Sequence, residues 1–265
     1  MKNIWSYFDK WYVITLVDRD VSKLEKNLRR SRLKNYEVLR YVPAKKTENV
    51  PAKASILELI MHSTCDETGK NITQNHLTTI QKAYDNGYKN VVILEDDAEF
   101  QLPIDMGKVK NMCGWLSKSE WEIFYMGHCP WPIPLSRLKN LDIVQPYTAL
   151  LAHCYALSRK GMHKILRYAR TMKKTGKWLQ PDKLFQVVPL VKYASFPSIS
   201  YQNKPPAIFK EIFRRLNWEL PYNKIFYVLE IWAIVLPVII LLLIIYLIVR
   251  TIRKSPHQSS SNRHS

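Results

Sequence analysis

The chain has 265 residues, 47% of them hydrophobic, which is enough to bury one sizeable core, and seven glycines against fifteen prolines exclude a glycine-rich linker protein. Its formal charge of +18 implies attraction to polyanions, but charge alone does not choose between nucleic acid, an anionic membrane and a phosphorylated small substrate. The basic residues are spread along the chain, and those clustered at 26–34 are typical of a solvated helix face. We therefore expect no nucleic-acid partner.

The amino-terminal segment and the cysteines bear on the compartment. The apolar run at 11–17 is too short for a secretory signal, so we expect the main domain to stay in the cytosol. The cysteines form no CxxC pair and have no histidine at zinc-finger spacing, which predicts neither a zinc module nor a disulfide framework: Cys65, Cys113, Cys129 and Cys154.

Strand-like and helix-like segments alternate along the first two thirds of the chain. Apolar and β-branched runs predict strands at 12–17, 36–42, 89–94, 121–126 and 154–157, and helical spacing predicts helices at 21–33, 73–86 and about 159–172. Ser158 is placed to cap the last of these helices, and Asn86-Gly87 to end the helix before the third strand. Strand, helix and strand in repetition predict an α/β sandwich with a mainly parallel sheet.

The most informative stretch is 91–100, where four apolar residues run straight into Glu95, Asp96 and Asp97. Such a run is typical of a strand covered on both faces, and ligands bind α/β sheets at the carboxyl ends of such strands. Three adjacent carboxylates repel one another, and a divalent cation that prefers oxygen ligands, Mg²⁺ or Mn²⁺, offsets that repulsion. The alternative is a solvated acidic turn, and the stretch by itself leaves both open.

The C-terminal part predicts a membrane span. Residues 231–249 are nineteen residues without a charge, followed by Arg250, Arg253 and Lys254. A helix of that length reaches roughly 30 Å, the thickness of a hydrocarbon core, although a buried helix of a soluble domain is the alternative. Residues 206–230 mix apolar residues at helical spacing with cations and aromatics, as in an amphipathic juxtamembrane helix or one packed on the domain. Positive residues lie on both sides of the span, so its orientation stays open.

Several separated segments resemble glycosyltransferase family 25, which includes bacterial lipooligosaccharide glycosyltransferases and procollagen galactosyltransferases. Residues 12–16 (YVITL) and the following Arg19 are similar to the family's opening strand. Residues 75–77 (NHL) stand where the family has Ser-His-Leu, and residues 94–98 (LEDDA) match its acidic motif. Residues 121–127 (WEIFYMG) are similar to its W-D-I-L-Y-L-G strand, and residues 153–161 (HCYALSRKG) to its H-A-Y-x-I-S-R-K-G segment. Pro181-Asp182, Pro197 and Gln202 complete a resemblance that covers about residues 11–205.

The resemblance implies a GT-A-like catalytic domain at 1–205, followed by a juxtamembrane segment at 206–230, a transmembrane helix at 231–249 and a basic disordered tail at 250–265. By the family's motif, Asp97 matches the direct metal ligand, Glu95 a second metal-site position that holds ribose or metal-bound water, and Asp182 the catalytic base of inverting enzymes. The remaining candidates for donor binding are Asn75, His76, Asp96 and His153, with Arg159 and Lys160 as diphosphate partners. From the residues alone, Asp182 is more typical of a helix N-cap than of a catalytic base, and the asparagine and the histidines are equally typical of structural hydrogen-bonding groups.

The implied activity is inverting transfer of a hexose, galactose or glucose, from a UDP-sugar to a glycan or protein hydroxyl, with Mn²⁺ or Mg²⁺ as the cofactor and the lipid bilayer as a further partner. A cation neutralises the leaving diphosphate, and a carboxylate accepts the proton of the attacking hydroxyl. The sequence departs from the family at two places, which weakens the assignment of the family's function to this chain. Asn75 replaces the family's Ser, with no Gly-Cys before it. No histidine follows Asp182 in the globular part, so Gln202 or water would substitute as the late metal ligand. The alternatives are a membrane-tethered sugar- or partner-binding pseudoenzyme and a metal-dependent nuclease.

Overall fold

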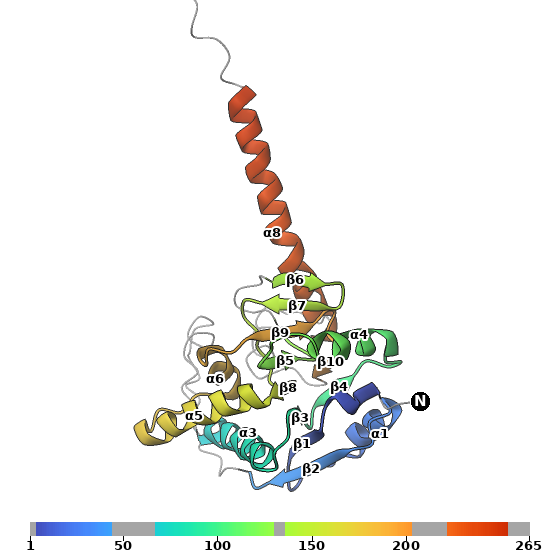
Figure 1. Ribbon diagram of the computed structural model, residues 1–265, viewed down its shortest axis with the longest axis vertical. Coiled ribbons are helices and arrows are strands. Elements are labelled where there is room, and N and C mark those ends of the chain that lie inside the picture. Colours follow the sequence, from blue (N-terminus) through green and yellow to red (C-terminus); the bar gives the residue numbers. More distant parts are fainter. Residues whose placement is uncertain (1–3, 44–66, 130–135, 203–221, 254–265) are drawn as a thin grey trace, which may run out of the picture.

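The computed structural model describes residues 4–43, 67–129, 136–202 and 222–253. One eight-stranded sheet runs through the globular part in the order β2-β1-β3-β8-β5-β9-β7-β6, and a two-stranded sheet, β10-β4, lies beside it (Figure 1). The strands of the large sheet are β1 (Lys10–Leu16), β2 (Tyr36–Tyr41), β3 (Asn90–Glu95), β5 (Ile123–Tyr125), β6 (Ser136–Asn140), β7 (Ile143–Pro146), β8 (Cys154–Ser158) and β9 (Lys192–Ser195). The small sheet pairs β4 (Ala98–Phe100) with β10 (Ser200–Gln202).

The large sheet is mixed, but most of its strands share one direction. The pairs β1–β2, β1–β3 and β5–β9 are parallel, whereas β3–β8, β5–β8, β7–β9 and β6–β7 are antiparallel. Following these pairings across the sheet, only β8 and β7 are reversed, so six of the eight strands point the same way. The prediction of an α/β fold with a mainly parallel central sheet is confirmed.

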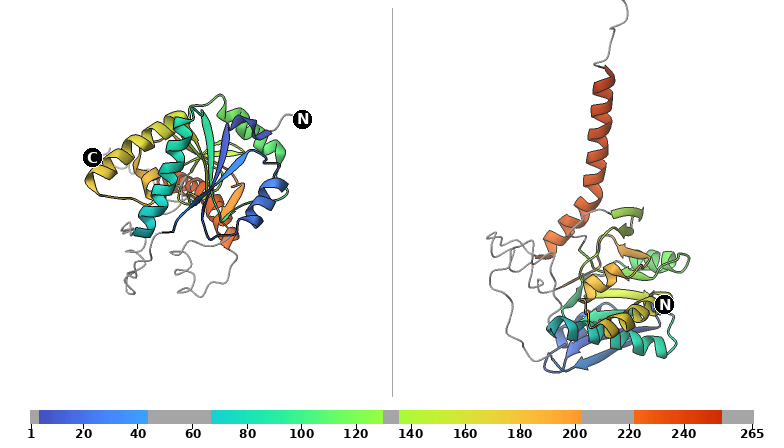
Figure 2. Two further views of the ribbon diagram at one scale, coloured as in Figure 1. Left: turned by 90° about the horizontal axis from the view of Figure 1, so that it is seen from below. Right: turned by 90° about the vertical axis from the view of Figure 1, so that its left-hand side faces the viewer.

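Helices cover both faces of the sheet, which gives three layers (Figure 2). Helices α3 (Glu67–Asp85), α5 (Arg159–Thr175) and α6 (Pro181–Val187) bury apolar residues in one core cluster with Val91 and Ile93 of β3. The short 3-10 helix η1 (Ile4–Tyr7), α1 (Ser22–Arg30) and α4 (Met106–Leu116) share the opposite cluster with Val92 and Leu94. Because alternate residues of a strand face opposite sides, the unbroken apolar run of β3 is needed to fill both layers.

The elements predicted from the sequence are present, with shifted boundaries. Ser158 caps α5 as expected, since its hydroxyl accepts a hydrogen bond from the Gly161 amide at 3.2 Å. Helix α3 begins at Glu67, six residues before the predicted start, and α4, α6, β4, β6, β7, β9 and β10 were not predicted.

The C-terminal helix α8 (Tyr222–Arg253) contains the predicted span. Within the described residues, Glu230–Arg250 is the one helical segment long and apolar enough to cross a membrane, and Pro237 lies inside it. The helix projects away from the globular part, and its side chains are exposed from Val238 to Arg250 (Figure 1). Residues 206–221 of the predicted juxtamembrane segment and residues 254–265 of the predicted tail lie outside the described residues.

Candidate functional site

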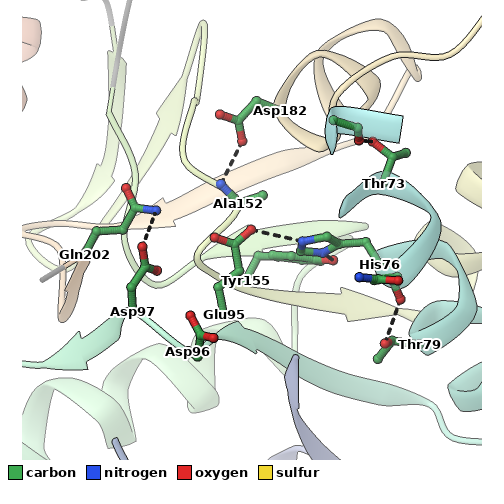
Figure 3. Close-up of polar contacts among 12 residues, drawn as sticks. Thr73, His76, Thr79, Glu95, Asp96, Asp97, Ala152, Tyr155, Asp182 and Gln202 are labelled. Carbon is green, nitrogen blue, oxygen red and sulfur yellow. Dashed lines mark hydrogen bonds and ion pairs between the residues drawn. The ribbon is translucent and has the colours of Figure 1, made fainter. Parts of the chain in front are cut away.

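The acidic motif lies at the end of β3, between two neighbouring strands whose polar residues lie at the same edge of the sheet. Strand β1 ends beside it at Leu16, and β8 begins beside it at Cys154, so that the Glu95 amide donates to the His153 carbonyl at 2.8 Å. Helix α6 adds Asp182 to this edge (Figure 3). Residues far apart in the sequence therefore form one cluster of three carboxylates, those of Glu95, Asp97 and Asp182.

Glu95 is held by a histidine from α3. The Glu95 Oε1 lies 3.0 Å from His76 Nε2, and His76 Nδ1 lies 2.8 Å from the Tyr155 hydroxyl (Figure 3). Burial opposes ionisation of Glu95, but the hydrogen bond and charge of His76 outweigh it and hold the pKa of the glutamate below its usual value. Because both ring nitrogens of His76 are engaged within the chain, this histidine positions Glu95 and has no ring nitrogen left for a ligand.

Asp96 faces away from the other two acids of the motif. Its Oδ2 accepts a hydrogen bond from the Thr15 hydroxyl at 2.7 Å, and its Oδ1 pairs with Arg19 at 2.6 Å. Both partners come from the carboxyl end of β1 and the turn after it. Asp96 thus ties the ends of β1 and β3 together and holds the exposed guanidinium of Arg19 at the edge of the cluster.

Asp97 is the member of the motif whose bonding is incomplete. Its Oδ1 is buried and has no hydrogen-bond partner among the described residues, and its Oδ2 lies 3.5 Å from Gln202 Nε2, at the limit of a hydrogen bond. Burial, followed by the negative charges of Glu95 and Asp96, raises the pKa of Asp97 to about 7. A proton or a bound cation would each stabilise a partly buried carboxylate in this state.

Asp182 lies on α6 and binds another segment of the chain. Its Oδ1 accepts a hydrogen bond from the Ala152 amide at 2.7 Å, in the loop before β8 where Leu151 has a φ of 75° (Figure 3). The N-cap of α6 is Gln180, so the alternative interpretation of Asp182 as the cap of its own helix is wrong. Burial raises the pKa of Asp182 to about 6, although the amides of Leu151 and Ala152 act in the opposite direction.

His153 and Asn75 are the other two residues predicted to contact the donor, and their hydrogen bonding differs. The His153 Nε2 is 3.3 Å from the Ser200 carbonyl, and its buried Nδ1 has no partner among the described residues. Burial lowers the pKa of His153 to about 4, so its ring is neutral. Asn75 is buried on α3, next to His76, and its carbonyl accepts the Thr79 hydroxyl.

The predicted diphosphate partners Arg159 and Lys160 are not in this cluster. Ser158, which precedes them, pairs with Asn90 at the opposite end of β3. Arg159 donates to the Tyr84 carbonyl at 3.1 Å and lies over the Tyr84 ring. The interpretation of these residues as diphosphate partners is therefore wrong, because α5 begins at the amino-terminal end of β3. Arg19 supplies a cation at the edge of the carboxylate cluster; the sequence resemblance includes it after the opening strand but gave it no role in the site.

The carboxylate cluster offers too few ligands to hold a metal ion without help from a substrate. Within the described residues, no three His, Cys, Asp or Glu side chains are arranged to hold an ion by themselves. Asp97 supplies the unengaged carboxylate oxygen, with the partly buried Glu95 next to it. Mg²⁺ is commonly held by one or two carboxylates together with substrate phosphates and water. The donor set therefore fits an ion that binds together with a phosphorylated substrate.

Comparisons with known proteins leave the family open. No protein-family model matches the sequence, and no curated protein matches it. Among solved structures, a protein from STIV is 14% identical with a TM-score of 0.43, over 74% of this chain and 86% of that chain. A glycosyltransferase involved in the glycosylation of the major capsid of PBCV-1 is 10% identical with a TM-score of 0.37, over 70% of this chain and 80% of that chain. Likeness this distant establishes neither a family nor an activity.

Proposed function

We propose that the chain is a metal-dependent glycosyltransferase with a GT-A-like domain, related to family 25, and that α8 anchors it in a membrane. Its reaction moves a hexose, galactose or glucose, from a UDP-sugar to a glycan or protein hydroxyl with inversion. The observation that carries the proposal is the state of Asp97: a raised pKa and a buried oxygen without a partner, at the sheet edge where α/β folds bind ligands. The sequence resemblance independently gives Asp97 the metal position.

Each residue of the cluster has a role in this reaction. Asp97 and Glu95 would hold Mn²⁺ or Mg²⁺, which neutralises the charge that develops on the leaving UDP. Asp182, as the carboxylate, accepts the proton of the acceptor hydroxyl while that oxygen forms its bond to the anomeric carbon and the bond to UDP breaks. His76 keeps Glu95 in place, and the guanidinium of Arg19 is available to a donor phosphate at the cluster's edge.

Transfer assays on the full-length protein in detergent test the proposal. UDP release from UDP-galactose and UDP-glucose should require Mn²⁺ or Mg²⁺ and stop on addition of a chelator. Asp97→Asn should abolish the metal-stimulated rate, whereas Glu99→Gln should not, because Glu99 is a neighbouring carboxylate paired with Lys23 at the surface, 3.2 Å away. If Asp97→Asn retains the wild-type rate, the metal site is wrongly assigned.

The alternatives give other outcomes. A pseudoenzyme would bind UDP in the presence of Mn²⁺ but release no UDP from any UDP-sugar with any acceptor. A nuclease would cleave DNA or RNA, and loss of this cleavage in Asp97→Asn would show that the metal site serves the nuclease reaction.

The membrane anchor is tested separately. Extraction of membranes with alkaline carbonate should leave the full chain in the pellet. Its appearance in the supernatant would show that α8 does not span the bilayer.

A further inference from the structure

Apolar side chains are exposed on the β6–β7 hairpin, which forms one edge of the large sheet. Leu138 is 45% exposed, Leu141 at the turn is 85% exposed, and Tyr147 just after β7 is 69% exposed. Strand β6 also carries Arg137 and Lys139, the kind of charge with which edge strands prevent pairing with another chain. Apolar side chains interleaved with cations suit the interface of a lipid bilayer rather than another strand.

The hairpin lies near the point where α8 leaves the globular part (Figure 1). Helix α8 contacts β6, and it leaves the globular part on the side where β6 is the outermost strand (Figures 1 and 2). If α8 enters a membrane, the hairpin is the part of the sheet that meets the membrane surface. The adjoining surface suits that position, because Arg137 on β6 is exposed and cations favour an anionic interface.

The first turns of the apolar segment belong to the globular part. The buried Glu230 accepts a hydrogen bond from the Ser198 amide at 3.0 Å and another from the Ser198 hydroxyl. Ala233 is fully buried, and Ile234 packs against the core cluster that contains α3, α5 and α6. These contacts fix the point at which α8 becomes free to enter lipid, after residue 234.

The part of the helix that remains is short for a membrane. Residues 235–249 are the fifteen apolar residues between Ile234 and Arg250. At 1.5 Å per residue they reach about 22 Å, compared with a hydrocarbon core of about 30 Å. A short span is accommodated by thinning of the bilayer or by extension of flanking side chains to the interface. Apolar side chains that lie beside the span can enter the interface as well, as those of amphipathic segments do. The hairpin supplies such a surface at the required place.

We propose that the β6–β7 hairpin is a second membrane contact, with Leu138, Leu141 and Tyr147 inserted at the boundary between headgroups and acyl chains. The proposal rests on the span of α8 that is part of the proposed function. It makes the domain's attachment rigid, because two separate elements, the hairpin and α8, fix its orientation on the membrane. It adds the lipid surface itself as a ligand of the sheet edge.

Site-directed fluorescence on the full chain in anionic nanodiscs tests this contact. Leu141→Cys, in a Cys65→Ser background, carries an environment-sensitive NBD label; the other three cysteines are buried. The matched control is Ile72→Cys on α3, which is 42% exposed and lies among the helices away from β6. The label at 141 should emit at shorter wavelength than the label at 72, and lipids with a shallow nitroxide should quench it at least about twofold more, since an interfacial group enters about 5–10 Å.

A third label, at Leu242→Cys in the middle of the span and read with lipids that carry a deep nitroxide, separates the two hypotheses. Quenching at 242 and 141 but not at 72 supports the hairpin contact. Quenching at 242 alone leaves the anchor in place and overturns the hairpin contact. Absence of quenching at 242 overturns the span, and the hairpin contact with it. Leu138→Cys should behave like Leu141→Cys, which guards against a local effect of one substitution.

Discussion

Replacement of Asp97 by asparagine separates the effect of this carboxylate on folding stability from its proposed role in metal binding. With no cation bound, burial and the charges of Glu95 and Asp96 raise its pKa from 3.8 to about 7. At about 1.4 kcal/mol per pKa unit, the ionised form costs at most roughly 4 kcal/mol of folding free energy. Because Asp97 is only partly buried, we expect about 2–3 kcal/mol.

The direction of the raised pKa determines how the free energy of unfolding changes with pH. The folded-state pKa is above the unfolded value, so the unfolded chain releases this proton first as pH rises. The free energy of unfolding of the wild type therefore falls between about pH 4 and pH 7, and the loss is complete above that range. Asp97→Asn has no proton to lose. In chelator at pH 8 the variant should be more stable than the wild type, and at pH 5 the difference should shrink.

Thermal unfolding of the full chain in detergent measures this difference. At pH 8 with chelator, Asp97→Asn should unfold about 5–10 °C above the wild type. Addition of Mn²⁺ and UDP should stabilise the wild type and leave the variant unchanged, because the ligand binds the native state through this carboxylate. Glu99→Gln, at the surface ion pair, should match the wild type in both conditions. A variant less stable than the wild type at pH 8 would refute the reasoning.

Three further predictions concern the surroundings of Asp97. Asp182→Asn should lower the transfer rate about 100-fold or more with UDP binding retained, and because burial raises the pKa of Asp182 to about 6, wild-type kcat/KM should fall as pH drops below about 6. His76→Phe should cost about 1–3 kcal/mol in denaturant unfolding, since it leaves Glu95 and the Tyr155 hydroxyl without their partner. Gly127→Ala should cost about 1–3 kcal/mol, because its Cβ would overlap the Ser200 carbonyl and the His153 ring; Gly114→Ala, with nothing near its Cβ, should not.

The sequence was sufficient to predict that the acidic motif follows a buried strand but not how its side chains are arranged. The apolar run 91–94 has to fill two core layers, so its strand and the acids at its end follow from local pattern alone. The division of labour within the motif depends on residues about eighty positions away. Asp96 turns toward Thr15 and Arg19 because β1 pairs with β3, and this pairing leaves Asp97 as the carboxylate without a full set of partners.

The elements that were not predicted are short or weakly patterned. Strands β7 and β9 have four residues each, too few for a period to be recognised, and β9 reads Lys-Tyr-Ala-Ser. Helix α4 has glycines at 107 and 114, which lower its helical propensity, and it is held by the core contacts of Val109 and Met112. Arg159 and Lys160 were misplaced because a sequence match does not reveal at which end of the sheet a helix starts.

The strand order sets the distance between the proposed membrane contact and the acids at the end of β3. From β6 to β3 there are five steps across the sheet, and at about 4.8 Å per step the acids at the end of β3 stand about 24 Å from the hairpin. With the hairpin on the bilayer, as proposed, a hydroxyl on a bare lipid headgroup would not reach a donor held by these acids. The acceptor of the proposed reaction would then be a group that extends well beyond the membrane surface, such as a glycan chain or a protein, and the labels at 141 and 72 decide whether this distance applies.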